Sequence, residues 1–196
     1  MKYEKHSKGD IKAYLIQDED ALNPFDDWDT LGTLVTWHRN YTFGGVNGIK
    51  EYPEGPQALL DELDTEELLR LPVYLFDHSG LTVSTKPFGC QWDSGQVGYI
   101  YITHKAWKDE FQGGKESKEE AEERAYEILR SEIEALDQLL TGDVWGVVVE
   151  KTVRCEACGD EKEEHLDSCW GFFGSEYAEQ ECERMFDAVV KHEEAA

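Results

Sequence analysis

The sequence predicts an α+β fold built on a mainly antiparallel sheet, with one long amphipathic helix and a C-terminal helix packed on it. Several short runs rich in β-branched and aromatic residues end at turn-forming residues, as the strands of such a sheet do. One helical pattern extends over about residues 118–140, and another begins at Ser175. Because these patterns follow runs of strands and do not alternate with them, we expect helices gathered on an antiparallel sheet.

The N-terminal part of the chain supplies the first strands. Residues 1–10 are polar, and we expect them to form a flexible N-terminus. The run 11–17 is typical of a strand, and the alternating run 33–38 is typical of a half-buried strand. The simplest interpretation of Trp28 and Trp37 is that both side chains lie in the core.

The middle of the chain is predicted to hold the centre of the sheet. Residues 71–77 and 97–103 carry apolar side chains at both alternating sets of positions, which indicates central strands covered on more than one side. A short strand is expected over residues 81–85. Pro56 suits the first position of a helix, and the leucines that follow predict one or two short helices that end at Pro72.

Two helical patterns have clear starting signals. Ser117 followed by Glu120 has the form of a capping box and opens the longest pattern, while Ser175 is placed to cap the last one. A shorter helix is expected from Thr103, as its cap, to Phe111. The apolar stripes predicted to face the sheet comprise Ala121, Ala125, Ile128, Leu129, Ile133, Leu136 and Leu140 in the long helix, and Ala178, Cys182, Met185, Phe186 and Val189 in the last.

A β-hairpin is predicted over residues 144–173. Its first strand is the apolar run 145–149, the Gly-Asp dipeptide at 159–160 is a strong turn signal, and the second strand returns over about 165–173. No repeat or low-complexity segment interrupts the chain. We therefore expect a single α+β domain over residues 11–192.

The charge of the chain is strongly negative. Its 43 Asp and Glu against 19 Lys and Arg give a net charge of −24 and a pI of about 4.4. Such a surface repels nucleic acid, so direct binding of DNA or RNA is not expected. Two interpretations remain open: the carboxylates stand in for phosphates in the basic groove of a partner protein, or they keep the protein soluble.

The sequence carries no signal of a membrane-spanning or secreted protein. No run approaches the roughly 18 consecutive apolar residues that a membrane helix needs, and the opening MKYEKHSKGDIK has no apolar stretch like that of a signal peptide. We expect a cytoplasmic protein with no membrane partner. The number of cysteines, five, is odd, and the chain is large enough to be stable without disulfide bonds. Both observations favour reduced thiols or a metal site over a disulfide framework.

The polar segment between the two central strands is the candidate catalytic site. Cys90 lies there in a turn-prone stretch, where a thiol is accessible. A thiol nucleophile needs a base and an orienting acid, and the candidates are His78 beside Asp77, or His104 beyond the next strand. Their spacing matches no thiol-enzyme signature. The sequence therefore does not fix a reaction, and it favours a role without catalysis.

Two other interpretations of the same segment remain open. In the first, Asp93, Ser94 and Gln96 satisfy backbone groups of a long loop, while Trp92 and Phe88 plug the core beneath it. In the second, the loop is a binding surface anchored by an aromatic side chain. The binding candidates are then Trp92, Asp93, Ser94 and Gln96, together with Asp26, Asp27 and Asp29 around Trp28.

A zinc knuckle is a candidate at the tip of the predicted hairpin. Cys155, Cys158, His165 and Cys169 form the pattern C-x₂-C-x₆-H-x₃-C, and thiolates and imidazoles are ligands of Zn²⁺. In a regular hairpin Cys169 lies about 15 to 20 Å from the knuckle, so one ligand must come from elsewhere or the hairpin must bend. The alternative is a tip without metal. A bound zinc ion is expected to be structural.

The segment DSCWGFFG at residues 167–174 closes the hairpin. Cys169 and Trp170 are placed to face the same sheet region as Cys90 and Trp92, since both pairs lie at strand junctions. The alternative is that the aromatic residues of this segment pack in the core, with its glycines allowing a close approach of backbones.

Four blocks stand out along the chain: NPFDDWDTLGTLVTWHRNY, LPVYLFDHSGLTVSTKPFGCQWDSGQVGYIYIT, LTGDVWG and DSCWGFFG. Together, over about residues 23–174, they resemble a family of uncharacterised proteins carried by bacteriophages, prophages and other mobile elements. The insert CEACGDEKEEH departs from the shorter connection typical of that family. The resemblance implies a phage setting and the cytosol of a host cell, and it brings no established reaction with it.

Charge and resemblance together lead to the main functional hypothesis. We expect an acidic phage-type accessory protein that binds a host protein with a basic nucleic-acid-binding groove, as an anti-CRISPR or anti-restriction DNA mimic does. One alternative is a thiol-dependent or hydrolytic enzyme that uses Cys90 with His78 or His104. Another is a zinc-stabilised adaptor built on the hairpin around Cys155.

Overall fold

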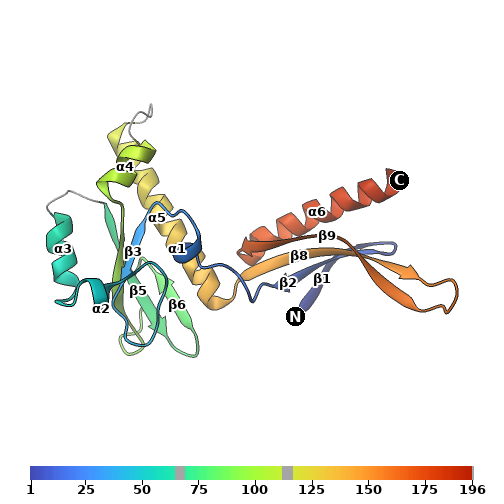
Figure 1. Cartoon of the computed structure of the whole chain (residues 1–196), viewed down its shortest axis with the longest axis horizontal. Helices are drawn as coiled ribbons and strands as arrows, with labels where there is room; N and C mark the ends of the chain where they lie inside the picture. The colour runs from blue at the N-terminus through green and yellow to red at the C-terminus, as the bar shows by residue number, and fades with distance from the viewer. Residues whose placement is uncertain (65–68, 112–116, 196) are drawn as a thin grey trace. The chain divides into compact units, whose positions relative to one another are not determined.

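The structure is a computed structural model that describes residues 1–64, 69–111 and 117–195. The chain forms two compact units: a terminal unit made of Met1–Ala21 and Gly142–Ala196, and a central unit made of Leu22–Thr141 (Figure 1). Each unit has its own sheet and hydrophobic core, whereas the sequence predicts one domain over residues 11–192. The α+β class, with mainly antiparallel pairing, a long helix and a C-terminal helix, is confirmed.

The central unit is built on a five-stranded sheet. Its strands are β3 (Thr33–Thr36), β4 (Val46–Asn47), β5 (Arg70–Asp77), β6 (Leu81–Ser84) and β7 (Ser94–Tyr101). They lie in the order β4-β3-β7-β5-β6, in which the short pair of β3 and β4 is parallel and the other pairs are antiparallel. β5 and β7, which contain the two runs predicted to be central strands, are each paired on both sides.

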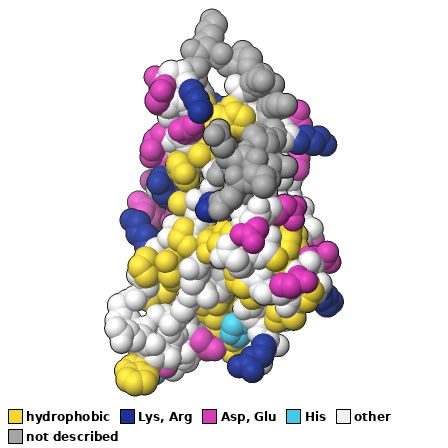
Figure 2. Space-filling view, turned by 90° about the vertical axis from the view of Figure 1, so that its left-hand side faces the viewer, with side chains coloured by type: hydrophobic (Ala, Val, Ile, Leu, Met, Phe, Trp, Pro, Cys, Tyr) yellow, Lys and Arg dark blue, Asp and Glu magenta, His cyan; other side chains and the backbone are white. Residues whose placement is uncertain are grey.

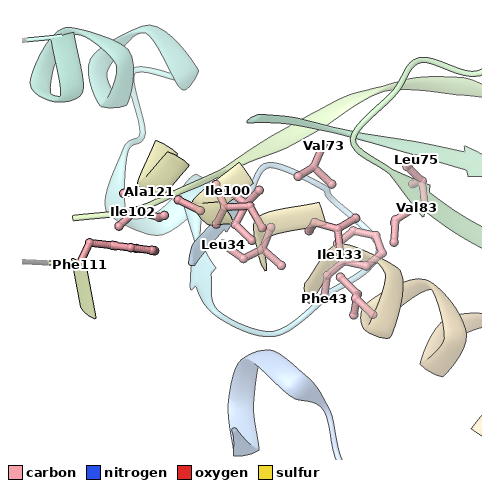
Figure 3. Close-up of a cluster of buried hydrophobic side chains, with 13 residues drawn as sticks. Leu34, Phe43, Val73, Leu75, Val83, Ile100, Ile102, Phe111, Ala121 and Ile133 are labelled. Carbon is pink, nitrogen blue, oxygen red and sulfur yellow. The ribbon is translucent and has the colours of Figure 1, made fainter. Parts of the chain in front are cut away.

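One face of this sheet is covered by α5 (Lys118–Thr141). The predicted capping box is present, because the Ser117 N–H donates to the Glu120 carboxylate at 2.9 Å and the Glu120 N–H donates to Ser117 Oγ at 3.2 Å. The buried side of the helix packs on residues from β3, β5, β6 and β7 (Figure 3). The helix contributes Ala121, Ala125, Leu129, Ile133 and Leu136 to this core, and the strands contribute Leu34, Val73, Leu75, Val83 and Ile100.

Two carboxylates of α5 accept hydrogen bonds from backbone N–H groups outside the helix. Glu132 accepts from Leu31 at 2.6 Å and from Gly32 at 2.9 Å, and Asp137 accepts from Val83 at 2.8 Å. Burial raises the pKa of both carboxyl groups, although the hydrogen bonds act to lower it. These bonds fix the position of the helix along the sheet.

The opposite face of the sheet is covered by α3 (Pro56–Asp64). Leu59 and Leu63 of this helix form a buried cluster with Val35 and Tyr101 of the strands, and Trp37 packs against it as predicted. Burial raises the pKa of the Tyr101 hydroxyl to about 12.

Shorter helices of the central unit are α1 (Pro24–Asp27), α2 (Gly48–Glu51) and α4 (His104–Phe111). Trp28, predicted to lie in the core, is instead 44% exposed, because it follows α1 in an extended conformation that ends the helix. Among the described residues, no helix combines the length and the apolar composition that crossing a membrane requires.

The terminal unit is a four-stranded antiparallel sheet with α6 (Ser175–Ala195) on one face. The strands β1 (Lys2–Lys8), β2 (Ile11–Gln17), β8 (Val144–Arg154) and β9 (Glu161–Phe173) lie in the order β1-β2-β8-β9. The prediction that Cys182 is a core residue is confirmed. The core comprises Ile11, Ala13, Leu15, Val147, Val149, Ala178, Cys182, Phe186 and Val190.

Residues 1–10, predicted to be a flexible terminus, contain strand β1. This strand pairs with β2 from Lys2 to Lys8. It is an edge strand with polar side chains on both faces, so its sequence lacks the alternation that marks a half-buried strand. Ion pairs of Lys5 with Glu179, and of Lys8 with Glu194 at 2.6 Å, add contacts from the strand to α6.

β8 and β9 form the hairpin predicted over residues 144–173, and its end projects beyond the rest of the sheet (Figure 1). The two strands stay paired up to Arg154 and Glu161, whereas β2 reaches only Lys151 on β8. We call residues 152–163 the hairpin arm, and its tip is the loop 155–160. β9 begins at Glu161, earlier than the predicted start at about residue 165. The sequence did not predict this early start, because the first residues of the strand are exposed and polar on both faces.

Candidate functional site

The segment that holds the candidate catalytic residues brings three side chains together at one end of the central sheet. β5 ends at Asp77 and β7 begins at Ser94, which pairs with Phe76. The Asp77 N–H donates to the carbonyl oxygen of Asp93 at 2.8 Å. This register places His78, the first residue after β5, beside the residue that precedes β7.

In the resulting cluster a carboxylate lies between a thiol and an imidazole. The Cys90 thiol donates to Asp93 Oδ2 at 3.7 Å, and His78 Nδ1 lies 3.2 Å from the same oxygen. Because both contacts share one atom, the Cys90 sulfur and His78 Nδ1 are at most 6.9 Å apart, the sum of the two distances. The Ser94 hydroxyl donates to the Cys90 carbonyl oxygen and holds the loop closed. We call Cys90, Asp93 and His78 the thiol cluster.

The order of groups in the thiol cluster differs from that of an activated nucleophile. In thiol enzymes the base contacts the thiol, and the acid orients the base from its far side. Here Asp93 contacts both partners, so His78 reaches the sulfur only after the carboxylate moves aside. The side chains of His78 and Asp93 are 65% and 40% exposed, which leaves room for that movement.

Of the other two candidate catalytic residues, only Asp77 has a described side chain, and it contacts a residue outside the cluster. Asp77, the expected orienting acid, accepts a hydrogen bond from the hydroxyl of Tyr41, and this bond raises the pKa of Tyr41. His104 is the first residue of α4, and its side chain lies outside the described residues.

Tyr41 is a residue that the sequence reasoning missed, and it borders a small cavity. The cavity, about 130 Å³, is lined among others by His38, Tyr41 and Asn47. His38 Nδ1 accepts the Tyr41 N–H at 3.1 Å, and the two rings stack at 4.8 Å between centroids. A volume well below roughly 300 Å³ is too small for most organic ligands. No local signal marks Tyr41, because its partner Asp77 is distant in sequence.

Trp92 does not plug the core. Its side chain is 93% exposed, and Phe88 alone of that predicted pair packs inward, with its ring 5.7 Å from the ring of Phe76. Gln96 Nε2 donates to the carbonyl oxygen of Gly98 at 3.2 Å. Ser94 and Gln96 therefore satisfy backbone groups, as one interpretation of the loop predicts, while Trp92 stands free beside the thiol cluster.

The acidic binding candidates around Trp28 are exposed, and two of them also serve local structure. Asp27 accepts the Asn23 N–H at 2.9 Å, and Asp26 accepts the Gly45 N–H at 3.2 Å. Asp29 follows α1 on the surface. These carboxylates thus order the start of the central unit, and their role in binding stays a prediction.

The four residues predicted to hold zinc are exposed along the hairpin, but they do not lie together. Cys155 and Cys158 share the tip loop. His165 pairs with Glu150 and Cys169 with Val147, so they lie about 15 and 25 Å down the ribbon from Cys155, at about 3.3 Å per residue. Within the described residues no group of three or more His, Cys, Asp and Glu side chains is close enough to hold a metal ion. Zinc binding stays a prediction.

The expected meeting of two Cys–Trp pairs in one sheet does not occur. β9, which carries Cys169 and Trp170, pairs with β8 in the terminal unit, whereas the strands next to Cys90 belong to the sheet of the central unit. Trp170 is 49% exposed and lies over Gly146, where a Cβ atom would come within 2.2 Å of the indole. The glycine therefore allows a close approach of ring and backbone.

No protein-family model matches the chain, and no curated protein or solved structure matches it either. The resemblance to proteins of bacteriophages and mobile elements accordingly stays a prediction.

Proposed function

We propose that this protein is an acidic, phage-type accessory protein that acts without catalysis in the cytosol of a host cell. It binds a host protein through the basic groove that normally holds nucleic acid, as an inhibitor of a restriction or CRISPR complex would, and does not bind nucleic acid itself. The observation that carries this proposal is the net charge of −24. Carboxylates at this density are attracted to surfaces that evolved to hold phosphates.

Both units contribute to the charge. The terminal unit has 20 Asp and Glu against 9 Lys and Arg, a net charge of −11, and the central unit has 23 against 10, a net charge of −13. A single acidic tail or loop would leave one unit near neutral. The excess is instead shared between both units, and part of it lies on their long helices.

The two long helices display the carboxylates in rows. At about 100° per residue, the exposed acidic residues of α6 fall within about 80° of arc, and those of α5 within about 100°. Neighbours in a row are about 1.5 to 10.5 Å apart along the helix axis, against about 3.4 Å per phosphate along a DNA strand. The α6 row is Glu176, Glu179, Glu183, Asp187 and Glu194, and the α5 row is Glu119, Glu120, Glu123, Glu127 and Glu134.

Several basic residues near these rows are paired with carboxylates, among them Lys5 and Lys8 with Glu179 and Glu194 of the α6 row. Lys151 contacts Glu193, and Arg130 lies 3.5 Å from Glu123. Such pairs reduce the local positive potential and leave the surplus of carboxylates to set the sign of the field. The rows are not the whole surface: on the face shown in Figure 2, Asp and Glu are scattered among Lys, Arg and hydrophobic side chains.

The proposal is tested by capture followed by competition. Immobilised protein is exposed to lysate of a bacterial host with restriction or CRISPR complexes, and the retained proteins are identified by mass spectrometry. We expect a nucleic-acid-binding complex that duplex DNA releases in a concentration-dependent way. Retained proteins without a nucleic-acid site, or a complex that DNA does not displace, would end the proposal.

Two triple variants with equal changes of charge identify the surface responsible. Glu176→Gln, Glu183→Gln and Asp187→Asn together remove three charges from the α6 row. Glu19→Gln, Asp20→Asn and Glu54→Gln remove three exposed charges outside both long helices. If the α6 row stands in for phosphates, the first variant weakens capture more than the second. Equal losses would show that only the total charge matters.

A second candidate function is thiol chemistry at Cys90, and the thiol cluster is the observation that favours it. An imidazole within 6.9 Å of the sulfur becomes its base after one side-chain movement. The test is the rate of alkylation of Cys90 by iodoacetamide in the wild type and in His78→Ala. Activation by His78 predicts slower alkylation in the variant, whereas equal rates assign the cluster a structural role.

A further inference from the structure

The loop at the tip of the hairpin arm has a defined conformation. The Cys155 N–H donates to the Asp160 carbonyl oxygen at 2.8 Å, which closes the hairpin, and the Gly159 N–H donates to the Cys155 carbonyl oxygen at 2.9 Å, which forms a turn inside it. Gly159 has a φ of 75°, a conformation that glycine adopts without strain. The turn brings the two cysteines to the same side of the loop.

Backbone N–H groups of the turn and the Asp160 carboxylate lie near the two thiols, which also influence each other. Both cysteines are exposed.

These contacts make the two thiols unequal. Hydrogen bonds from the Cys158 N–H, the Cys158 thiol and the Ala157 N–H lower the pKa of Cys155. The Asp160 N–H acts to lower the pKa of Cys158, but the Asp160 carboxylate and the Cys155 sulfur outweigh it and raise that pKa. Other charged groups at the tip are Glu156, Glu161 and Arg154, whose Nε donates to the Gly159 carbonyl oxygen at 3.1 Å.

We propose that Cys155 and Cys158 form an exchangeable dithiol, which reacts with small disulfides of the glutathione type and closes into an intramolecular disulfide. The pair lies at the tip of the projecting hairpin arm (Figure 1), and both cysteines are exposed. This inference goes beyond the proposed function and does not depend on it.

The exchange has two balanced steps. The Cys155 thiolate attacks one sulfur of the small disulfide, whose S–S bond breaks, so that a mixed disulfide forms and one small thiolate leaves. Cys158 then loses its proton toward the Asp160 carboxylate, and its sulfur attacks the Cys155 sulfur, which releases the second small thiol. The dithiol is oxidised by two electrons, the small disulfide is reduced by two, and both thiol protons end on the released thiols.

The loop geometry suits a disulfide that opens and closes. A turn holds the Cα atoms of its first and fourth residues within about 7 Å, and disulfides span Cα separations of about 4.4 to 6.8 Å. The bond closes a ring of few residues, so it removes little entropy from the unfolded chain. Both the reduced and the oxidised loops are therefore compatible with the hairpin arm.

The test uses the whole protein, reduced, treated with a chelator and desalted. It is incubated in buffers of reduced and oxidised glutathione, and the remaining thiols are then alkylated and mapped by mass spectrometry. We expect loss of two hydrogen atoms, assigned to a Cys155–Cys158 bond that excess reduced glutathione reverses. Stable glutathione adducts without this bond, or thiols that stay reduced across the series, would overturn the proposal.

Variants separate the roles of the two sulfur atoms. Cys158→Ser should trap a lasting glutathione adduct on Cys155, because the resolving thiol is missing. Cys169→Ser removes an exposed thiol of the same hairpin and is the matched control, which should leave the Cys155–Cys158 bond unchanged. Loss of the bond in this control contradicts the proposal, as does zinc that stays bound after purification and shields both thiols until it is chelated.

Discussion

Glu132 shows how much of the fold can depend on one side chain. Its two carboxylate oxygens bind the N–H groups of Leu31 and Gly32, which lie a hundred residues earlier in the chain. A Cβ atom on Gly32 would come within 2.6 Å of the carboxylate, so the glycine is part of the same arrangement. The sequence shows Glu132 only as one more acidic residue of a helix.

Replacement of Glu132 by Ala should destabilise the central unit by about 1–3 kcal/mol, because two N–H groups that are partly buried lose their acceptor. Glu134→Ala, a change at an exposed position of the same helix, is the control and should have little effect. Urea denaturation measures both. Equal losses in the two variants would mean that the hydrogen bonds of Glu132 contribute nothing specific.

The pH dependence of Glu132 has a defined sign. Burial raises its folded-state pKa above the ordinary value of 4.5, so its contribution to the free energy of unfolding is complete below that value and is lost as pH rises through the folded pKa. We expect Glu132→Gln to cost more stability near pH 4.5 than near pH 7. A cost that grows with pH would show that the hydrogen bonds, and not burial, dominate the pKa of the Glu132 carboxyl group.

At the scale of secondary-structure elements, the capping box of α5 and the close contact between β8 and β9 permit separate tests. Ser117→Ala removes the acceptor of the Glu120 N–H and should cost about 1 kcal/mol in urea denaturation. Ser131→Ala is the control, since the Ser131 hydroxyl bonds only the Ile128 carbonyl oxygen within the helix. If both changes cost the same, the cap has no special role.

Gly146→Ala should destabilise the hairpin by about 1–3 kcal/mol, because the new methyl group meets the indole of Trp170. In a Trp170→Ala background the same change should cost much less. The double-mutant cycle is measured by denaturation. An unchanged cost in that background would show that the strain arises elsewhere.

The elements were predictable where their signals are local. The long helix has an apolar stripe and a capping box within its own sequence, and β5 and β7 each contain an apolar run. β1 was missed because a polar edge strand has no alternating pattern. The assignment of strands to two sheets was missed because β2 pairs with β8 across about 130 residues, and no local feature encodes that partner.

The dependence on distant strand pairing also explains which features of the candidate site could be predicted. Cys90, His78 and Asp93 were all singled out from residue type and turn-prone context, and the structure brings them together. Their order could not be predicted, because the side chain that stands between the other two is decided by the register of β5 and β7. Cys155 and Cys158 lie within one loop, so their proximity follows from sequence spacing, whereas the position of Cys169 depends on the length of the ribbon.

At the scale of the whole molecule, each long helix supplies one core. Leu129→Ala should cost about 2–5 kcal/mol in the central unit, since Leu129 is fully buried there, and Phe186→Ala should cost about 3–5 kcal/mol in the terminal unit. Hydrogen exchange should then show loss of protection mainly within residues 22–141 for the first variant and outside them for the second. Equal losses in both regions would show that the units unfold as one.

The net charge of −24 makes salt the most direct probe of function, because carboxylates that replace phosphates in a basic groove form many ionic contacts. The decisive measurement is the dissociation constant of the captured host complex as a function of salt concentration, with and without duplex DNA. We predict affinity that falls steeply as salt rises, and competition by DNA at each salt concentration. Affinity independent of both salt and DNA would contradict the proposal that this protein occupies a nucleic-acid groove.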